Sequence, residues 1–186
     1  SADLGKEKGS YPLFEGSGWN TGEWFKNKPF TFKDEWDEII EKASKHMRNA
    51  YLRAPAPTGS TSLLAGSTAA TEAVYDIVYM DGKKDALIPV VAPELNRSTY
   101  YFYRPTIRMK YEGEKDLAHM WAILQNEKRQ PWVDQAISSN IYVADDIAAS
   151  NFLRLHMENW ERGIKTSYYT RSHDSSREDA CLGCSA

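Results

Sequence analysis

The sequence is poor in cysteine: it contains two, Cys181 and Cys184, and both lie close to the end of the chain. A disulfide framework of the kind that holds small secreted domains together is therefore excluded. No apolar run approaches the ~18 residues that a membrane-spanning helix needs, and no secretory signal is recognisable. These absences predict a cytoplasmic protein without a membrane partner.

A strong charge of one sign is also missing, since 23 basic residues stand against 26 acidic ones. No basic surface for nucleic acid is predicted. The four histidines show no metal-ligand spacing, and two cysteines are too few for a structural zinc site. We therefore predict no metal site. The 186 residues, 41% hydrophobic, suffice for one domain with a sizeable core.

Hydrophobic periodicity predicts a mixed α/β protein. Residues 1–9 resemble the end of a helix with Gly9 as its stop, as in a piece of a longer protein. Residues 10–33 are rich in aromatic residues and are expected to be ordered by their rings. Helices are predicted at 34–49, with Asp34 as cap, near 63–66, at 115–128, and at 146–161, with Asp145 or Asp146 as cap. Strands are predicted at 73–80 and 87–92, around a turn at 81–84. Two further strands are predicted at 136–143 and 164–170. The last strand, helix and strand form one βαβ unit, which favours parallel pairing.

A hydroxyl-rich loop, Thr58, Gly59, Ser60 and Thr61, precedes the short predicted helix. Free backbone N–H groups and hydroxyls at such a place suit an anionic phosphate. No lysine follows the glycine, so the loop is not a Walker motif. A simple capping turn rich in Ser and Thr is the alternative reading and, on the local pattern alone, the more common one.

Tyr168 and Tyr169 are neighbours in the last predicted strand. On a regular strand they would point to opposite faces, one into the core and one to solvent. A functional pair requires the strand to end or distort there, so that both rings lie on one side. A tyrosine can then pass an electron while its phenolic proton moves to a neighbour.

Cys181 and Cys184 form a Cys-Leu-Gly-Cys pair after a polar, turn-rich stretch. This spacing allows a small reversible disulfide ring and often lowers the pKa of one thiol. A dithiol on a flexible tether favours a mobile electron carrier over a structural staple. Metal binding and unspecialised thiols are the alternatives.

Taken together, these motifs resemble the C-terminal part of the large (α) subunit of class I ribonucleotide reductase. The resemblance covers residues from near 1 to 186 and only the last quarter or so of a full subunit. It rests on the ordered series 54–62, 65–68, 134–138, 163–169 and 181–184.

The resemblance implies the C-terminal portion of a ten-stranded α/β barrel over residues 1–171, incomplete in this chain, with a flexible redox-active tail over 172–186. Thr58, Gly59, Ser60 and Thr61 would hold the phosphates of the ribonucleotide. Tyr168 and Tyr169 would relay a radical from a small, metal-containing β subunit, and this chain would bind no cofactor directly. Cys181 and Cys184 would re-reduce the active site and be recharged by a thioredoxin or glutaredoxin.

The implied activity is that of a ribonucleoside-diphosphate reductase in deoxyribonucleotide biosynthesis. Its barrel cysteines would come from the remainder of the α subunit, so the isolated chain is expected to be inactive. An adenosylcobalamin-dependent (class II) reductase, which needs no tyrosine relay, is one alternative. A non-catalytic nucleotide-binding module with an incidental dithiol is the other.

Overall fold

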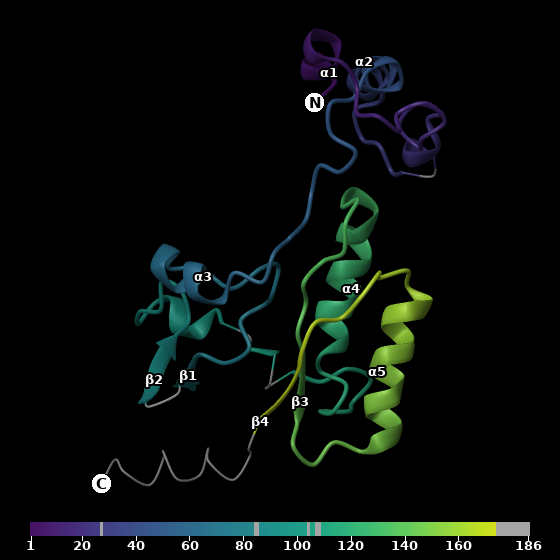
Figure 1. Ribbon diagram of the computed structural model, residues 1–186. Coiled ribbons are helices and arrows are strands. Elements are labelled where there is room, and N and C mark those ends of the chain that lie inside the picture. Colours follow the sequence, from purple (N-terminus) through teal and green to yellow (C-terminus); the bar gives the residue numbers. More distant parts are fainter. Residues whose placement is uncertain (27, 84–85, 104, 107–108, 174–186) are drawn as a thin grey trace, which may run out of the picture. The chain divides into compact units, whose positions relative to one another are not determined.

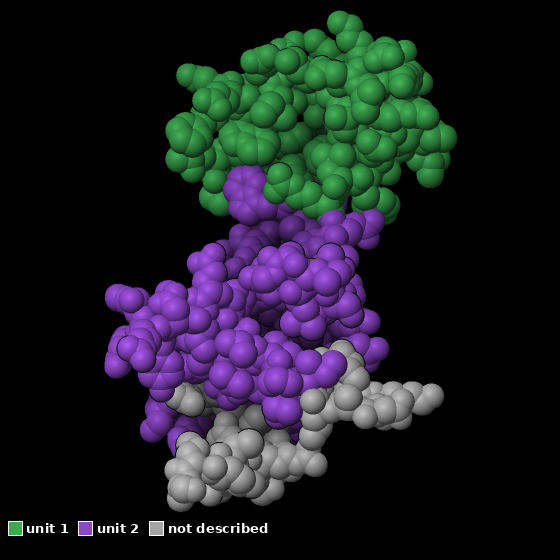
Figure 2. Space-filling model, turned by 90° about the vertical axis from the view of Figure 1, so that its left-hand side faces the viewer, with its two compact units in different colours: residues 1–53 green, residues 54–186 purple. Residues whose placement is uncertain are grey.

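The computed structural model describes residues 1–26, 28–83, 86–103, 105–106 and 109–173. The chain divides into two compact units, Ser1–Arg53 and Ala54–Ala186, coloured separately in Figure 2. Each unit has its own buried hydrophobic cluster. Among the described helices, none is both long enough and apolar enough to span a bilayer.

The first unit contains helix α1 (Ala2–Lys8), the 3-10 turn η1 (Glu23–Phe25) and helix α2 (Lys33–Lys45) (Figure 1). Helix α1 ends at Gly9, whose φ of 84° confirms the predicted stop. Gly5 lies in α1 directly against the backbone that follows α2: a Cβ added at Gly5 would meet the amide nitrogens of Met47 and Arg48 at 2.9 Å.

Aromatic side chains order the segment between α1 and α2, as its composition predicts. The rings of Trp19 and Trp24 stack with centroids 4.3 Å apart, and Trp19 Nε1 donates to the carbonyl of Ala50 (2.9 Å). Burial of such rings is among the largest apolar contributions a side chain makes. The buried members of this cluster are Phe14, Trp19, Phe25, Ala43 and Met47.

Helix α2 lies close to its predicted position but lacks the predicted cap. Its N-cap residue is Phe32, with no side-chain hydrogen bond, and Asp34 lies inside the first turn. The capping role expected of Asp34 is therefore wrong; its carboxylate instead places negative charge near the positive end of the helix.

The second unit begins with helix α3 (Gly59–Ala65) and an antiparallel hairpin of β1 (Val78–Lys83) and β2 (Ala86–Val91), followed by the 3-10 turn η2 (Thr99–Tyr101). The hairpin confirms the predicted pairing, but β1 begins five residues later than residue 73 and includes three residues of the predicted turn. Exposed apolar side chains remain on the hairpin: Val78, Tyr79, Met80, Ile88 and Val91.

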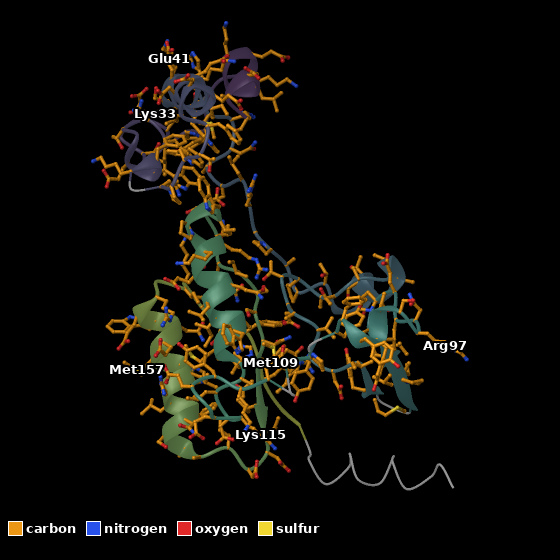
Figure 3. All side chains as sticks on the ribbon, turned by 180° about the vertical axis from the view of Figure 1, so that it is seen from behind. Lys33, Glu41, Arg97, Met109, Lys115 and Met157 are labelled. Carbon is orange, nitrogen blue, oxygen red and sulfur yellow. The ribbon has the colours of Figure 1, made fainter. Side chains whose placement is uncertain are left out.

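Helix α4 (Met120–Arg129), the 3-10 turn η4 (Gln130–Trp132), strand β3 (Ile141–Ala144), helix α5 (Ala149–Glu161) and strand β4 (Thr170–His173) complete the described chain. Strands β3 and β4 pair in parallel with Ile141 opposite Thr170, which confirms the parallel pairing of the predicted βαβ unit (Figure 1). The predicted position of the last strand, 164–170, is wrong, because β4 begins only at Thr170. Helix α5 lies beside α4, and Met157 is exposed on its surface (Figure 3).

The cap of α5 is not the predicted one. Its N-cap residue is Ala148, so the capping role expected of Asp145 or Asp146 is wrong. The carboxylate of Asp116 lies at this end of the helix: its Oδ2 accepts from the Ala148 backbone N–H (3.4 Å) and from Asn151 Nδ2 (3.2 Å).

The core of the second unit joins α4, β3 and α5. Leu117, Met120, Ile123, Ile141, Val143, Leu155 and Ile164 form one buried cluster. The mixed α/β class is confirmed. The strands of the described residues form two sheets of two strands each, and neither sheet closes, so the barrel remains a prediction at this point.

Candidate functional site

The two neighbouring tyrosines lie together. The ring centroids of Tyr168 and Tyr169 are 4.2 Å apart, with an angle of 56° between the ring planes. Strand β4 begins only at Thr170, so both residues precede its regular part. Their side chains are 48% and 54% exposed, respectively. Both rings therefore lie on one side and remain accessible, which is the geometry that a functional pair requires.

The surroundings of the pair affect its protonation. A hydrogen bond with Tyr169 is the main cause that raises the pKa of Tyr168. The electrostatic interaction with the same Tyr169 phenol raises it further. The guanidinium carbon of Arg171 lies 5.7 Å from the centre of the Tyr169 ring, a cation–π distance. The two effects of Tyr169 raise the pKa further above neutral pH, where the Tyr168 phenol carries its proton.

The hydroxyl-rich loop forms the beginning of α3. Thr58 is its N-cap residue, and Gly59, Ser60 and Thr61 make up the first turn. The first helical bond runs from the Ser62 N–H to the Thr58 carbonyl (2.8 Å), so the preceding three amides have no partner within the helix. Gly59, Ser60 and Thr61 are exposed, which leaves these amides and two hydroxyls accessible to a ligand.

Thr58 has a structural bond of its own. Its Oγ1 accepts from the backbone N–H of Ala70 (2.8 Å) and fixes the chain that follows α3 against the chain that precedes it. Ser62, the next hydroxyl, is buried and donates to the Gly59 carbonyl (2.9 Å). The loop is thus held by the hydroxyl of Thr58 and by that of the adjoining Ser62.

Residues 138–140 adjoin both predicted sites. The N–H of Ser138 donates to the carbonyl of Pro55 (3.1 Å), on the chain that leads into the loop. The N–H of Tyr168 donates to the carbonyl of Ser139 (2.8 Å). One short segment is therefore bonded to the approach of the hydroxyl loop and to the tyrosine pair.

A polar cluster that sequence reasoning missed holds this segment. Glu72 uses both carboxylate oxygens: Oε1 accepts from the Asn140 N–H (3.0 Å) and Oε2 accepts from the Tyr142 phenol (2.8 Å). Burial is the main cause that raises the pKa of Tyr142, and Glu72 raises it further. The Tyr142 ring stacks on that of Tyr75 with centroids 4.4 Å apart. No sequence spacing links Glu72 to residues some seventy positions away, so nothing in the pattern separates it from a surface glutamate.

His119 borders the same cluster and is buried. Its Nδ1 accepts from the Tyr142 backbone N–H (3.4 Å), and burial lowers its pKa to about 4. It is therefore a neutral core histidine and not a ligand. No group of three or more His, Cys, Asp or Glu residues in the described ranges could hold a metal ion. The predicted tail thiols, Cys181 and Cys184, lie outside the described residues.

Comparison with known proteins identifies the chain's relatives. The family described as "Ribonucleotide reductase, barrel domain" matches residues 1–170. The ribonucleoside-diphosphate reductase subunit alpha of Treponema pallidum is 35% identical over 187 residues, covering 100% of this chain and 21% of the relative. The same-named subunit of Helicobacter pylori (strain J99) is 34% identical, covering 96% and 24%, and that of Bacillus subtilis is 29% identical, covering 99% and 28%.

The chain spans about a quarter of the length of these curated relatives. The match includes the hydroxyl loop and extends through both tyrosines to Thr170. The ordered motifs and the extent of this match lead to one conclusion: the chain belongs to the ribonucleotide reductase barrel domain family.

Proposed function

We propose that this chain forms the C-terminal part of the catalytic subunit of a ribonucleoside-diphosphate reductase, the enzyme that converts ribonucleotides to deoxyribonucleotides. The subunit names of the relatives support this assignment. The observation that carries it is the contact between the rings of Tyr168 and Tyr169 at 4.2 Å. A regular strand would separate these rings, so their contact calls for a functional explanation.

The tyrosine pair would relay a radical. At each step an electron leaves one phenol for the oxidised group before it, and the phenolic proton moves to a neighbouring acceptor. Because both rings are half exposed, a second protein can reach them. A small β subunit with its own metal centre would generate the radical and would dock beside the pair.

The loop of Thr58, Gly59, Ser60 and Thr61 would bind the phosphates of the substrate. The loop offers three backbone amides without a partner in the helix and two exposed hydroxyls. These groups can donate hydrogen bonds to phosphate oxygens. Gly59 lets the ligand approach the backbone closely. A ribonucleotide held here would have its sugar available to groups contributed by the rest of the barrel.

The tail dithiol would provide reducing equivalents. Replacing a ribose hydroxyl by hydrogen releases water and requires two electrons, which two active-site thiols supply as they form a disulfide. Cys181 and Cys184 would reduce that disulfide by thiol–disulfide exchange and become a disulfide themselves. A thioredoxin or glutaredoxin would return them to thiols, consistent with a cytoplasmic setting.

The remaining machinery must come from elsewhere in the subunit. The chain has no cysteine before Cys181, so the cysteine that abstracts the ribose hydrogen and its two reducing partners lie outside these residues. The barrel would close only with that remainder. We therefore expect turnover from the assembled enzyme and none from this chain alone.

The decisive experiment substitutes the two phenols in the enzyme assembled with its remaining α residues and its β subunit. Tyr168→Phe and Tyr169→Phe should each abolish deoxyribonucleotide formation, because phenylalanine cannot be oxidised by a tyrosyl radical. Tyr51→Phe, at an exposed tyrosine of the first unit, is the matched control and should retain turnover. Full activity in either relay variant would reject the relay and favour the adenosylcobalamin-dependent alternative.

A second measurement addresses the tail. The double variant Cys181→Ser, Cys184→Ser should complete one turnover per prereduced site and then stop when thioredoxin is the donor. Continued turnover at the unmodified rate would show that the dithiol is incidental.

A further inference from the structure

The contact between the two tyrosine rings has an origin in the pairing of their strand. In a parallel ladder, a residue donates to a carbonyl of its partner strand and accepts from the amide two positions further along that strand. The Ile141 N–H donates to the Tyr169 carbonyl (2.8 Å). Continuing this register backwards, the carbonyl of Ser139 should accept from Tyr169.

The observed donor to Ser139 is instead Tyr168 (2.8 Å). The tyrosine strand therefore holds one surplus residue at this point. Tyr168 and Tyr169 together stand opposite the single residue Asn140, while Thr170 is already back in register with Ile141. This two-against-one count defines a β-bulge, which disturbs the alternation of side chains and can re-aim one of them.

The bulge displaces one backbone donor, and a side chain accepts from it. The N–H of Tyr169, which has no place in the ladder, donates to Asn140 Oδ1 (3.3 Å). A backbone donor without a partner costs free energy comparable to a missing hydrogen bond. The amide side chain of Asn140 thus stabilises the irregular conformation that brings the two rings together.

Asn140 is itself held from the other side. Its backbone N–H donates to Glu72 Oε1 (3.0 Å), and its Nδ2 lies 3.5 Å from the phenol oxygen of Tyr142, which donates to Glu72 Oε2. Glu72 lies two residues after Ala70, whose N–H is bonded to Thr58 of the hydroxyl loop. A short stretch of chain with hydrogen bonds at both ends therefore joins that loop to the tyrosine bulge.

We propose that Asn140 is the positioning residue of the tyrosine pair: its side-chain oxygen maintains the bulge that places both rings on one face, and Glu72 orients Asn140. This role deepens the proposed relay and rests on it. Asn140 takes no part in electron transfer; it sets the distance over which the transfer occurs.

The test measures the proximity of the rings in the α subunit that joins this chain to its remaining residues, without the β subunit. 3-Fluorotyrosine is incorporated at positions 168 and 169, and the ¹⁹F–¹⁹F Overhauser effect between the two rings is recorded by NMR. The parent chain should show the effect. Asn140→Ala, which removes the acceptor, should abolish it. Asn140→Asp keeps an acceptor oxygen at the same place and should restore the effect. A general loss of folding would instead abolish the effect in both variants.

An Overhauser effect that persists in Asn140→Ala would overturn the proposal, and so would its disappearance in both variants with the far-ultraviolet circular dichroism unchanged. If Asn140→Ala does not fold, an ester in place of the Tyr169 amide removes the donor and leaves every side chain intact. The effect should then disappear, and its retention would again overturn the proposal.

These outcomes are separable from those of the relay itself. Ring proximity is measured without substrate or β subunit, whereas the relay is judged by the turnover of the phenylalanine variants. In the assembled enzyme, turnover of Asn140→Ala should fall at least tenfold and recover in Asn140→Asp. If the rings separate in Asn140→Ala while turnover stays unchanged, the role of Asn140 in positioning the relay is rejected.

Discussion

At the scale of single residues, His119 shows how burial sets the charge of a side chain. It is 3% exposed and accepts a hydrogen bond from the Tyr142 backbone at Nδ1, which requires the unprotonated nitrogen. Desolvation lowers its pKa from 6.5 to about 4. The folded chain therefore binds this proton less readily than the unfolded chain does.

This difference predicts acid sensitivity of the second unit. The contribution of His119 to the free energy of unfolding is fully present above about pH 6.5. It falls as the pH decreases towards about 4, by up to about 3 kcal/mol, because the folded chain resists protonation of this side chain. Urea unfolding at a series of pH values measures it. His119→Leu should flatten this dependence, whereas His46→Gln, at an exposed histidine, should retain it. An unchanged slope in His119→Leu would refute the assignment.

At the scale of elements, one arginine joins helices α4 and α5 of the second unit. Arg162 follows α5, and its guanidinium contacts Glu127 of α4 (Nη1 to Oε2, 3.0 Å) and Glu158 of α5 (Nε to Oε2, 2.8 Å). The three side chains are 27%, 27% and 18% exposed, so solvent screens them less than the open pairs of α2. The contact adds an electrostatic bond to the apolar core between these helices.

Removal of this link should be measurable. Arg162→Met keeps the aliphatic stem and loses the charge, and should lower the free energy of unfolding by about 0.5–1 kcal/mol, less at high salt. Lys45→Met, which breaks the exposed pair of Lys45 with Glu41, is the control and should have a smaller effect. Equal losses in the two variants would show that burial gives Arg162 no advantage.

The same scale shows what the sequence could and could not predict. Periodic patterns predicted α2, α4, α5, the hairpin and the parallel βαβ unit, because those elements are set by local alternation of apolar residues. The contact of Asp116 with the beginning of α5 was missed because it spans more than thirty residues of sequence.

The candidate site was predicted in the same uneven way. Its hydroxyls and phenols stand out in the sequence because they cluster in short motifs. The bulge at Asn140 and the carboxylate of Glu72 do not, because a pairing offset and a contact over 68 positions leave no local pattern. Alternation alone predicts that the two tyrosine rings diverge.

At the scale of the whole molecule, the two units differ in what holds them together. The first depends on stacked aromatic rings and the second on aliphatic side chains between helices and a sheet. Each unit carries three tryptophans: Trp19, Trp24 and Trp36 in the first, and Trp121, Trp132 and Trp160 in the second. Fluorine-labelled tryptophan therefore reports on the unfolding of each unit separately.

Gly5 offers a way to perturb only one unit. In Gly5→Ala the new methyl group would meet backbone nitrogens at 2.9 Å, and the crowding should destabilise the first unit by about 1–3 kcal/mol. The ¹⁹F signals of the first three tryptophans should then change at lower urea, while those of the last three stay in place. Gly18→Ala is the control, because its methyl carbon would lie 3.6 Å from the nearest atom, the Trp24 backbone nitrogen. A joint shift of all six signals would show that the units unfold as one.

The surplus residue opposite Asn140 also changes how relatives should be compared. A homologue that keeps the adjacent phenols but pairs the second of them, and not the first, with the carbonyl that corresponds to Ser139 would have a regular ladder there, and the two rings would turn apart. Matching letters at the dipeptide would then conceal that the two rings no longer touch. In comparing such proteins, the backbone pairing of this segment is a stricter criterion than the identity of the dipeptide.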